Sequence, residues 1–164
     1  QKNGARLWFK LGEVIIKPTI EGIIVTPLNR ISVPEGNVFH AMKRNDPGFS
    51  GFGEAYFSSI AKGAIKGWKR HKKMSLNLVV PVGAVRFVMF DDRDDSASYG
   101  IYQEVVLSKE NYCRLTVPPM IWMGFQCVDE KTSIVLNIAN IPHSQKEQDA
   151  KSIEEIEFDW SLNK

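Results

Sequence analysis

A basic run at residues 66–73, KGWKRHKK, gathers the side chains of this chain that are best suited to chemistry. In an extended strand, alternate side chains share a face. That alternation places Lys66, Trp68, Arg70 and Lys72 on one face and Lys69, His71 and Lys73 on the other. Arginine binds a diphosphate through paired hydrogen bonds, and lysine binds it as a compact charge. The run therefore predicts a site for an anionic ligand.

His71 is the residue of this run that could move a proton. Its basic neighbours on both sides favour the neutral imidazole, which is the form that accepts a proton. The run also fits a solvated, lysine-rich edge strand, because charge runs usually face water and edge lysines block aggregation. A ligand site and a solvated edge therefore both remain open from the residues alone.

Two further segments combine polar and aromatic side chains. In residues 49–57, FSGFGEAYF, glycines allow close approach to a ligand, aromatic rings can stack on a base, and Glu54 can accept a hydrogen bond from a base or a sugar hydroxyl. A glycine-kinked strand with its rings in the core explains the same segment and is the better interpretation of it alone. Residues 90–96, FDDRDDS, predict a solvated turn.

The elements that position these segments are predicted to be strands. Short runs rich in β-branched and aromatic residues alternate with Gly, Pro, Asn and Asp, at residues 23–25, 76–82, 85–90, 104–107, 112–117 and 133–138. Gly83 and Ala84 predict a tight hairpin between 76–82 and 85–90. Helical signals are confined to 58–60 and 145–153. This pattern predicts one all-β domain, a sandwich, jelly roll or closed barrel.

Both ends of the chain differ from the middle. Pro18, Pro27 and Pro34 break residues 1–40 into pieces suited to edge strands or an arm. Near the other end, Trp160 follows a charged stretch, which is typical of a ring that covers part of a core.

Composition excludes several classes of protein. A net charge of +2 without a basic block argues against nucleic acid, and no apolar run approaches a membrane span. Cys113 and Cys127 predict two buried thiols in a cytoplasmic protein. His40, His71 and His143 lie too far apart for ordinary metal spacing, so we expect neither a metal nor another cofactor.

Four segments, in order, resemble the dTDP-4-dehydrorhamnose 3,5-epimerase family over residues 46 to 140. Residues 46–54, DPGFSGFGE, resemble "D-x-R-G-x-F-x-E", and 65–68, IKGW, resemble the start of "L-R-G-L-H". Residues 90–100, FDDRDDSASYG, resemble "V-D-x-R…S-P-T-F-G". Residues 115–125, LTVPPMIWMGF, resemble "L-x-I-P-x-G-F-A-H-G-F".

This resemblance implies a cupin-like jelly-roll barrel without a metal, commonly a homodimer with exchanged N-terminal strands. It also implies a substrate, a nucleotide-diphosphate 4-keto-6-deoxy sugar used in surface polysaccharide synthesis. Enzymes of this family remove the acidic proton beside the ketone with a histidine and return a proton to the opposite face, often from a tyrosine. Nearby cations stabilise the enolate that forms between the two steps.

The chain departs from the family at the catalytic positions. The family's base falls on Lys69, and His71 lies two residues further on, where related ketoisomerases carry a second histidine. The histidine of "A-H-G-F" is replaced by Met123. The expected tyrosine falls near Leu136 and Asn137, and neither side chain can donate a proton as a phenol does.

We therefore predict an epimerase or isomerase that acts next to the ketone of such a sugar. His71 is expected to be the base, and Lys69 a second acid/base or enolate stabiliser. The substrate is expected to contact Phe52, Glu54, Lys66, Arg70, Lys72 and Asn137. The alternative is a catalytically inactive protein of the epimerase fold that binds a nucleotide sugar or a glycan.

Overall fold

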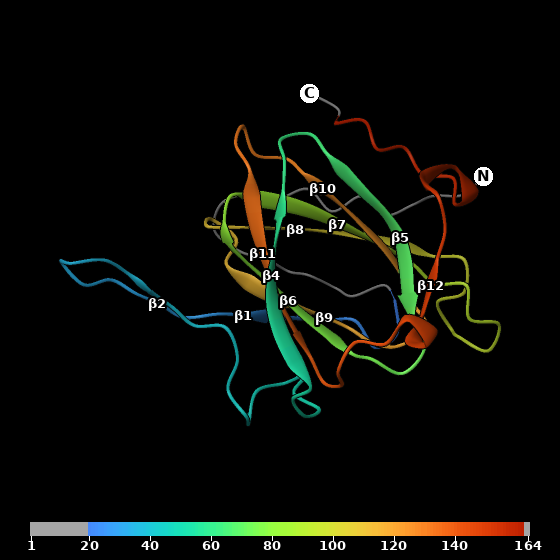
Figure 1. The fold of residues 1–164 in the computed structure, drawn as a ribbon, viewed down its shortest axis with the longest axis horizontal. Coiled ribbons are helices and arrows are strands. Elements are labelled where there is room, and N and C mark those ends of the chain that lie inside the picture. The colour runs from blue at the N-terminus through green and yellow to red at the C-terminus, as the bar shows by residue number, and fades with distance from the viewer. Residues whose placement is uncertain (1–19, 163–164) are drawn as a thin grey trace.

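Two five-stranded antiparallel sheets face each other in this protein (Figure 1). The structure is a computed structural model, and it describes residues 20–162. The first sheet consists, in order, of β1 (Ile24–Pro27), β9 (Cys113–Val117), β6 (Leu76–Val82), β11 (Ser133–Ala139) and β4 (Glu54–Ile60). The second consists of β12 (Gln148–Ala150), β5 (Ile65–His71), β10 (Trp122–Cys127), β7 (Ala84–Phe90) and β8 (Tyr102–Ser108). The predicted all-β jelly roll is confirmed.

Short elements complete the chain. β2 (Arg30–Ile31) and β3 (Val38–Phe39) pair in an arm that projects from the barrel in Figure 1. Near the C-terminus, the 3₁₀ helices η1 (Gln145–Glu147) and η2 (Ile153–Glu155) flank β12. Within residues 20–162, none of the helices is long and apolar enough to cross a membrane. Pro18, which was expected to break the N-terminal segment, lies outside the described residues.

The main hydrophobic core fills the space between the two sheets. Val85 and Phe87 from one sheet and Leu115 from the other are completely buried. Burial of a side chain of this size contributes about 1.5–3 kcal/mol to folding. Cys113 and Cys127 belong to this core as free thiols, in agreement with the prediction of two buried thiols.

The predicted hairpin at Gly83 is wrong. β6 pairs with β9 and β11, whereas β7 pairs with β8 and β10, so the chain passes at Gly83 from one sheet to the other. Gly83 has a φ of 83°, and an added Cβ would lie 2.1 Å from the hydroxyl oxygen of Ser133. Both strands contain long runs of buried residues, which a two-stranded hairpin alone cannot cover.

Two helical predictions also change. Residues 58–60 are not helical, because they form the end of β4, where Ser58 pairs with Val135 and Ile60 with Ser133. In the stretch 145–153, the prediction of helix is right for η1 but wrong for β12, which pairs with β5.

A second apolar cluster covers the outer face of the second sheet. Trp68 and Trp122 from the strands meet Ile156 and Trp160 from the C-terminal segment, and all four are buried. The rings of Trp68 and Trp160 lie 5.4 Å apart. Trp160 therefore covers a core, as the sequence predicts, and the cluster holds the C-terminal segment against β5.

Asp91 does not lie in a solvated turn as predicted. Its side chain is fully buried and accepts hydrogen bonds from the guanidinium of Arg93 and from the hydroxyls of Ser96 and Ser98. Burial alone would raise the pKa of Asp91, but these bonds and one from the Arg93 amide together hold that pKa well below its ordinary value. The ionised carboxylate thus organises the loop between β7 and β8.

We predict that Asp91→Asn lowers the free energy of unfolding by about 3–5 kcal/mol, because it leaves Arg93 without its buried partner. Since the pKa of folded Asp91 lies below the ordinary 3.8, the carboxylate stabilises the fold above that pH, and this contribution is lost as the pH falls through the folded value. Urea titration of the exposed control Asp95→Asn should give a change within about 0.5 kcal/mol. Equal stability of the two variants would contradict the assignment.

Candidate functional site

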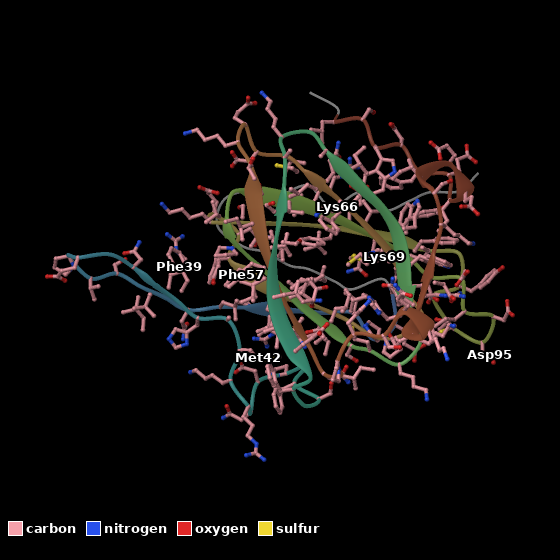
Figure 2. All side chains as sticks on the ribbon, in the orientation of Figure 1. Phe39, Met42, Phe57, Lys66, Lys69 and Asp95 are labelled. Atoms are coloured by element: carbon pink, nitrogen blue, oxygen red, sulfur yellow. The ribbon has the colours of Figure 1, made fainter. Side chains whose placement is uncertain are left out.

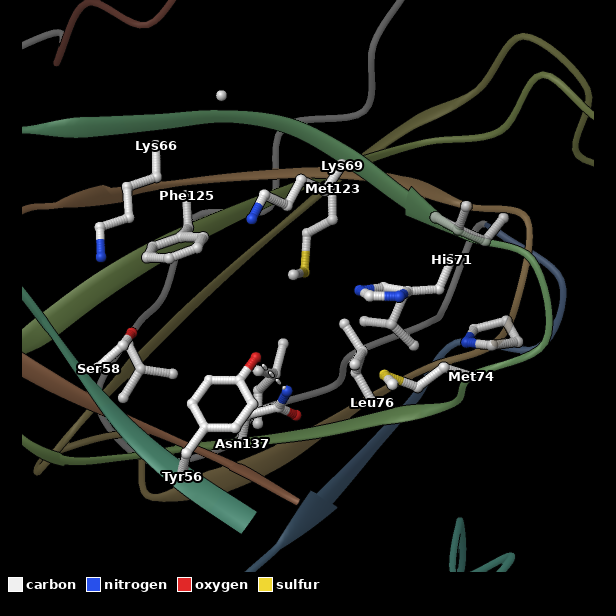
Figure 3. A pocket seen from close by; sticks show the side chains of 16 residues that line it. Tyr56, Ser58, Lys66, Lys69, His71, Met74, Leu76, Met123, Phe125 and Asn137 are labelled. Atoms are coloured by element: carbon white, nitrogen blue, oxygen red, sulfur yellow. Dashed lines mark hydrogen bonds between the residues drawn. The ribbon is translucent and has the colours of Figure 1, made fainter. Parts of the chain in front are cut away.

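A cavity of about 200 Å³ lies between the two sheets, lined by side chains of both (Figure 3). Much of its wall is apolar, from Met74, Leu76, Leu78, Val117, Pro118, Ile121, Met123, Phe125 and Val135. Its polar side chains are Tyr56, Ser58, Lys66, Lys69, His71 and Asn137. The predicted residues Lys66, Lys69, His71 and Asn137 therefore meet at one place.

A β-bulge in β5 brings the three basic side chains into the cavity. The stretch of β5 from Lys66 to Lys69 is one residue longer than its partner stretch of β10, from Phe125 to Met123. An extra residue reverses the alternation of side chains along the strand. Lys66 therefore joins Lys69 and His71 in lining the cavity, although strict alternation puts it on the opposite face.

Arg70 and Lys72, which were expected to contact the substrate, lie outside this cavity. Arg70 lies on the outer face of β5, where it forms ion pairs with Asp92 at 3.1 Å and Asp149 at 2.9 Å. Lys72 is half exposed and lies 3.5 Å from the carboxylate of Asp149. Neither residue lines the cavity, so the basic run combines a part that faces the cavity with a part at the surface.

His71 is held by a carboxylate from the C-terminal segment. Its Nδ1 lies 2.7 Å from Oε2 of Glu147, and the two side chains are only 13% and 9% exposed. The other oxygen of Glu147 accepts hydrogen bonds from the backbone amides of Lys73 and Met74. The basic neighbours of His71 in the sequence are therefore joined in the structure by a carboxylate, which the sequence did not indicate.

The ionisation of Glu147 fixes which nitrogen of His71 faces the cavity. Burial raises the pKa of Glu147, but the amide of Lys73, the ring of His71 and the amide of Met74 donate hydrogen bonds that together bring the pKa below its ordinary value. An ionised carboxylate can only accept, so Nδ1 donates to it. In the neutral ring, Nε2 then carries the lone pair, and Figure 3 shows the ring reaching into the cavity.

Two lysines place positive charge along the same wall. Figure 3 shows Lys66 at one end of the cavity, His71 at the other and Lys69 between them. The ammonium of Lys66 donates to the carbonyl of Ser59 and lies 5.6 Å from the ring centre of Phe125. The ammonium of Lys69 forms no hydrogen bond or ion pair with any residue of the described range 20–162.

Tyr56 is a cavity residue that the sequence interpretation considered only as an aromatic ring. It lies directly opposite Asn137 in the pairing of β4 with β11, and Nδ2 of Asn137 donates to its phenol oxygen at 2.9 Å. Tyr56 is 48% exposed, and the neighbouring Phe57, which does not line the cavity, is 68% exposed. Only the alternation along β4 and the identity of its partner strand could reveal which of the two faces the cavity.

Three residues singled out in the sequence lie elsewhere. Phe52, which is 67% exposed, and Glu54, at the start of β4, do not line the cavity. Leu136 of β11 likewise points away from it, while Met123 replaces the family histidine with a thioether at the cavity wall.

The comparisons with known proteins agree with the jelly-roll fold. The chain is 35% identical to the dTDP sugar isomerase of Desulfovibrio desulfuricans G20, whose structure matches with a TM-score of 0.85 over 88% of this chain and 94% of that one. The dTDP-4-dehydrorhamnose 3,5-epimerase of Sulfolobus tokodaii, 24% identical, shares the fold, with a TM-score of 0.75 over 87% and 84% of the two chains.

Curated relatives are more distant in sequence. SpsL of Bacillus subtilis, a spore coat polysaccharide biosynthesis protein, is 24% identical over 87% of this chain and 97% of its own length. Agl13 of Haloferax volcanii, a probable low-salt glycan biosynthesis epimerase, is 25% identical over 60% of this chain. That match spans 64% of Agl13, which is less than two thirds of its length.

Fold and cavity thus define the class, a cupin-like barrel of the sugar-nucleotide epimerase type. The family model for dTDP-4-dehydrorhamnose 3,5-epimerase matches residues 35–164. The chain belongs to the dTDP-4-dehydrorhamnose 3,5-epimerase family, and the family resemblance seen in its motifs is confirmed.

We predict that neutral His71 exists as the Nδ1-protonated tautomer, because Glu147 accepts from that nitrogen. Long-range ¹H–¹⁵N NMR of the histidine rings measures this directly, with the exposed His143 as an internal reference. Glu147→Gln should reduce the fraction of this tautomer, whereas Glu154→Gln, in the neighbouring 3₁₀ helix, should leave it unchanged. A predominant Nε2-protonated form in the unmodified protein would contradict the assigned geometry.

Proposed function

We propose that this protein epimerises a nucleotide-diphosphate 4-keto-6-deoxy sugar in surface polysaccharide biosynthesis, with His71 as the base. The observation that carries this proposal is the His71–Glu147 pair, which turns a proton-accepting nitrogen toward a cavity between the sheets. The names of SpsL and Agl13 support the polysaccharide or glycan setting.

The composition of the cavity wall supports a 6-deoxy sugar. Met74, Leu76 and Leu78 offer only apolar surface. A hydroxymethyl group buried there without a partner costs roughly 1–3 kcal/mol, whereas a methyl group is accommodated favourably. The polar side chains are left to bind the ketone and the ring hydroxyls.

The first chemical step is removal of a proton from a carbon beside the ketone. Nε2 of His71 accepts this proton, the electrons of the broken C–H bond form a double bond to C4, and the ketone oxygen becomes an enolate. Glu147 stabilises the resulting imidazolium. The ammonium of Lys69, which has no partner among residues 20–162, stabilises the negative charge on the enolate oxygen.

The second step returns a proton to the other face of the sugar. Tyr56 reaches the cavity from β4, on the wall across from Lys69 and His71 (Figure 3). Its O–H bond breaks, a C–H bond forms with inversion, and the enolate returns to the ketone. Water then restores the phenol and removes the extra proton from His71.

Tyr56 compensates for the tyrosine that the family pattern places near Leu136 and Asn137. Because Tyr56 is the cross-strand partner of Asn137, the phenol is supplied from the adjacent strand at the same level of the barrel. This substitution favours an active enzyme over a binding protein that has lost its chemistry.

A homodimer fits the exposed apolar surface of the arm and of β4. Ile31, Val33 and Val38 of the arm are 43–49% exposed, and Phe57 of β4 is 68% exposed. Figure 2 shows Phe39 on the arm and Phe57 on the barrel. A second copy that covers these residues removes apolar area from water.

We also propose that Phe52 and Glu54 contact the nucleotide. The exposed ring of Phe52 is free to stack on a base, and Glu54 lies next to it at the start of β4. The two buried free thiols support a cytoplasmic location, where the reducing environment keeps cysteines unpaired.

We predict that the protein exchanges a ring hydrogen of a dTDP-linked 4-keto-6-deoxy sugar for deuterium in deuterated water. His71→Ala should lower this exchange by roughly 10²–10⁴-fold, the usual contribution of a general base. Tyr56→Phe should retain exchange but lose inversion, because His71 can still return a deuteron to the face it attacked. Mass spectrometry and NMR of the recovered sugar separate the two outcomes.

Tyr99→Phe is the matched control, because Tyr99 is exposed and lies outside the cavity. Inversion at the unmodified rate in Tyr56→Phe would exclude this residue as the acid. Tight binding without any exchange, across dTDP-, GDP- and CDP-linked keto sugars, would favour the inactive binding protein instead.

We predict that Lys66→Met weakens dTDP binding about tenfold or more, because it removes a cation from the cavity. Lys72→Met, at the surface beside Asp149, should change the dissociation constant less than twofold. Isothermal titration calorimetry compares the two variants, and the reverse order would place the diphosphate on the outer face of β5.

A further inference from the structure

The side chain of Asn137 contains a buried acceptor that no described residue satisfies. Asn137 is only 4% exposed and lines the cavity. Its amide nitrogen donates to Tyr56, whereas its carbonyl oxygen has no hydrogen-bond partner within residues 20–162. A buried carbonyl without a donor is unfavourable, so this atom indicates a group that the ligand supplies.

The group that Asn137 requires is a hydrogen-bond donor close to Tyr56. The two side chains are joined by a 2.9 Å hydrogen bond, so a ligand group bound to the carbonyl oxygen of Asn137 lies beside the phenol. On a sugar, the uncharged donor is a hydroxyl. The carbon that receives a proton from Tyr56 must therefore carry this hydroxyl or neighbour the carbon that does.

The substrate class limits which carbons qualify. In a 4-keto-6-deoxy hexose linked to a diphosphate through C1, the free hydroxyls are those on C2 and C3. The other acidic carbon, C5, carries the ring oxygen and a methyl group. A hydroxyl beside Tyr56 thus belongs to the C2–C3 edge of the ring.

We propose that Asn137 accepts a hydrogen bond from a hydroxyl on the C2–C3 edge, so that C3 faces Tyr56 and is the carbon that is inverted. This inference rests on the proposed function and adds the position of the reaction and a residue that determines specificity. Figure 3 shows Met74 and Leu76 on the His71 side of the cavity, away from Tyr56, where they give the C5 methyl an apolar surface.

The amide of Asn137 also positions the acid. Because Nδ2 donates to the phenol oxygen, the hydroxyl proton of Tyr56 is directed elsewhere, into the cavity. The oxygen of the Asn137 side chain therefore binds the sugar hydroxyl, and its nitrogen orients the phenol of Tyr56.

The test uses the whole 164-residue chain and three dTDP-linked substrates, the 4-keto-6-deoxyglucose and its 2-deoxy and 3-deoxy analogues. In deuterated water, the unmodified protein should introduce deuterium at C3 and not at C5. The kcat/KM for exchange should be roughly 10- to 100-fold lower for at least one deoxy analogue. The analogue without the recognised hydroxyl leaves the carbonyl oxygen of Asn137 without a hydrogen-bond donor. Asn137→Leu should reduce this preference to within about threefold.

Asn45→Leu is the matched control, since Asn45 is exposed and lies outside the cavity, and it should keep the preference. Deuterium at C5 alone, or an unchanged preference in Asn137→Leu, would overturn the inference. The position of the deuterium is measured with the unmodified protein. This part of the test therefore still holds if a variant fails to fold. Failure to exchange any substrate at any carbon would instead reject the proposed function, on which this inference depends.

Discussion

The pairing of β5 on both of its edges is the constraint on which the candidate site depends. On one edge, β10 forces a bulge after Lys66 and so turns this side chain toward the cavity along with Lys69 and His71. On the other edge, β12 pairs with residues 69–71 and brings η1 beside them. Without the bulge the cavity loses one cation, and without β12 the base loses Glu147.

Charge is distributed around β5 according to what each face must bind. On the outer face, Arg70 is neutralised by Asp92 and Asp149, and the pKa of Asp149 is lowered, with its hydrogen bond to Arg70 as the first cause. On the inner face, the ammonium groups of Lys66 and Lys69 have no carboxylate partner among the described residues. A cavity with unneutralised cations in a largely apolar wall is suited to an anionic ligand and to an enolate.

Much of the fold could be predicted because it depends on local patterns. Short β-branched runs separated by turn residues specify a jelly roll, and Trp160 among charges indicates an outer apolar cluster. The hairpin at Gly83 could not be excluded from sequence, since a tight turn and a crossing between sheets use the same residue type. Asp91 was misassigned because its buried partners are visible only once the loop closes on itself.

Apart from Asn137, which the family resemblance supplied, the predicted residues that line the cavity all lie on one strand. Lys69 and His71 follow from alternation, but Arg70 and Lys66 were grouped together because a bulge leaves no signature in a single sequence. Glu147 is 76 positions away from His71 in the chain, and Tyr56 depends on the pairing of β4 with β11. These contacts arise from topology, and residue types alone do not determine them.

We propose that the sugar ring lies between His71 and Tyr56, with its ketone toward Lys69. A crystal structure of His71→Asn bound to a dTDP-linked 4-keto-6-deoxy sugar tests this claim most directly. We predict that the reacting carbon lies between residue 71 and the phenol of Tyr56, with the C4 oxygen next to the ammonium of Lys69. A sugar bound on the outer face beside Arg70, or a ring that does not separate these two side chains, would contradict it.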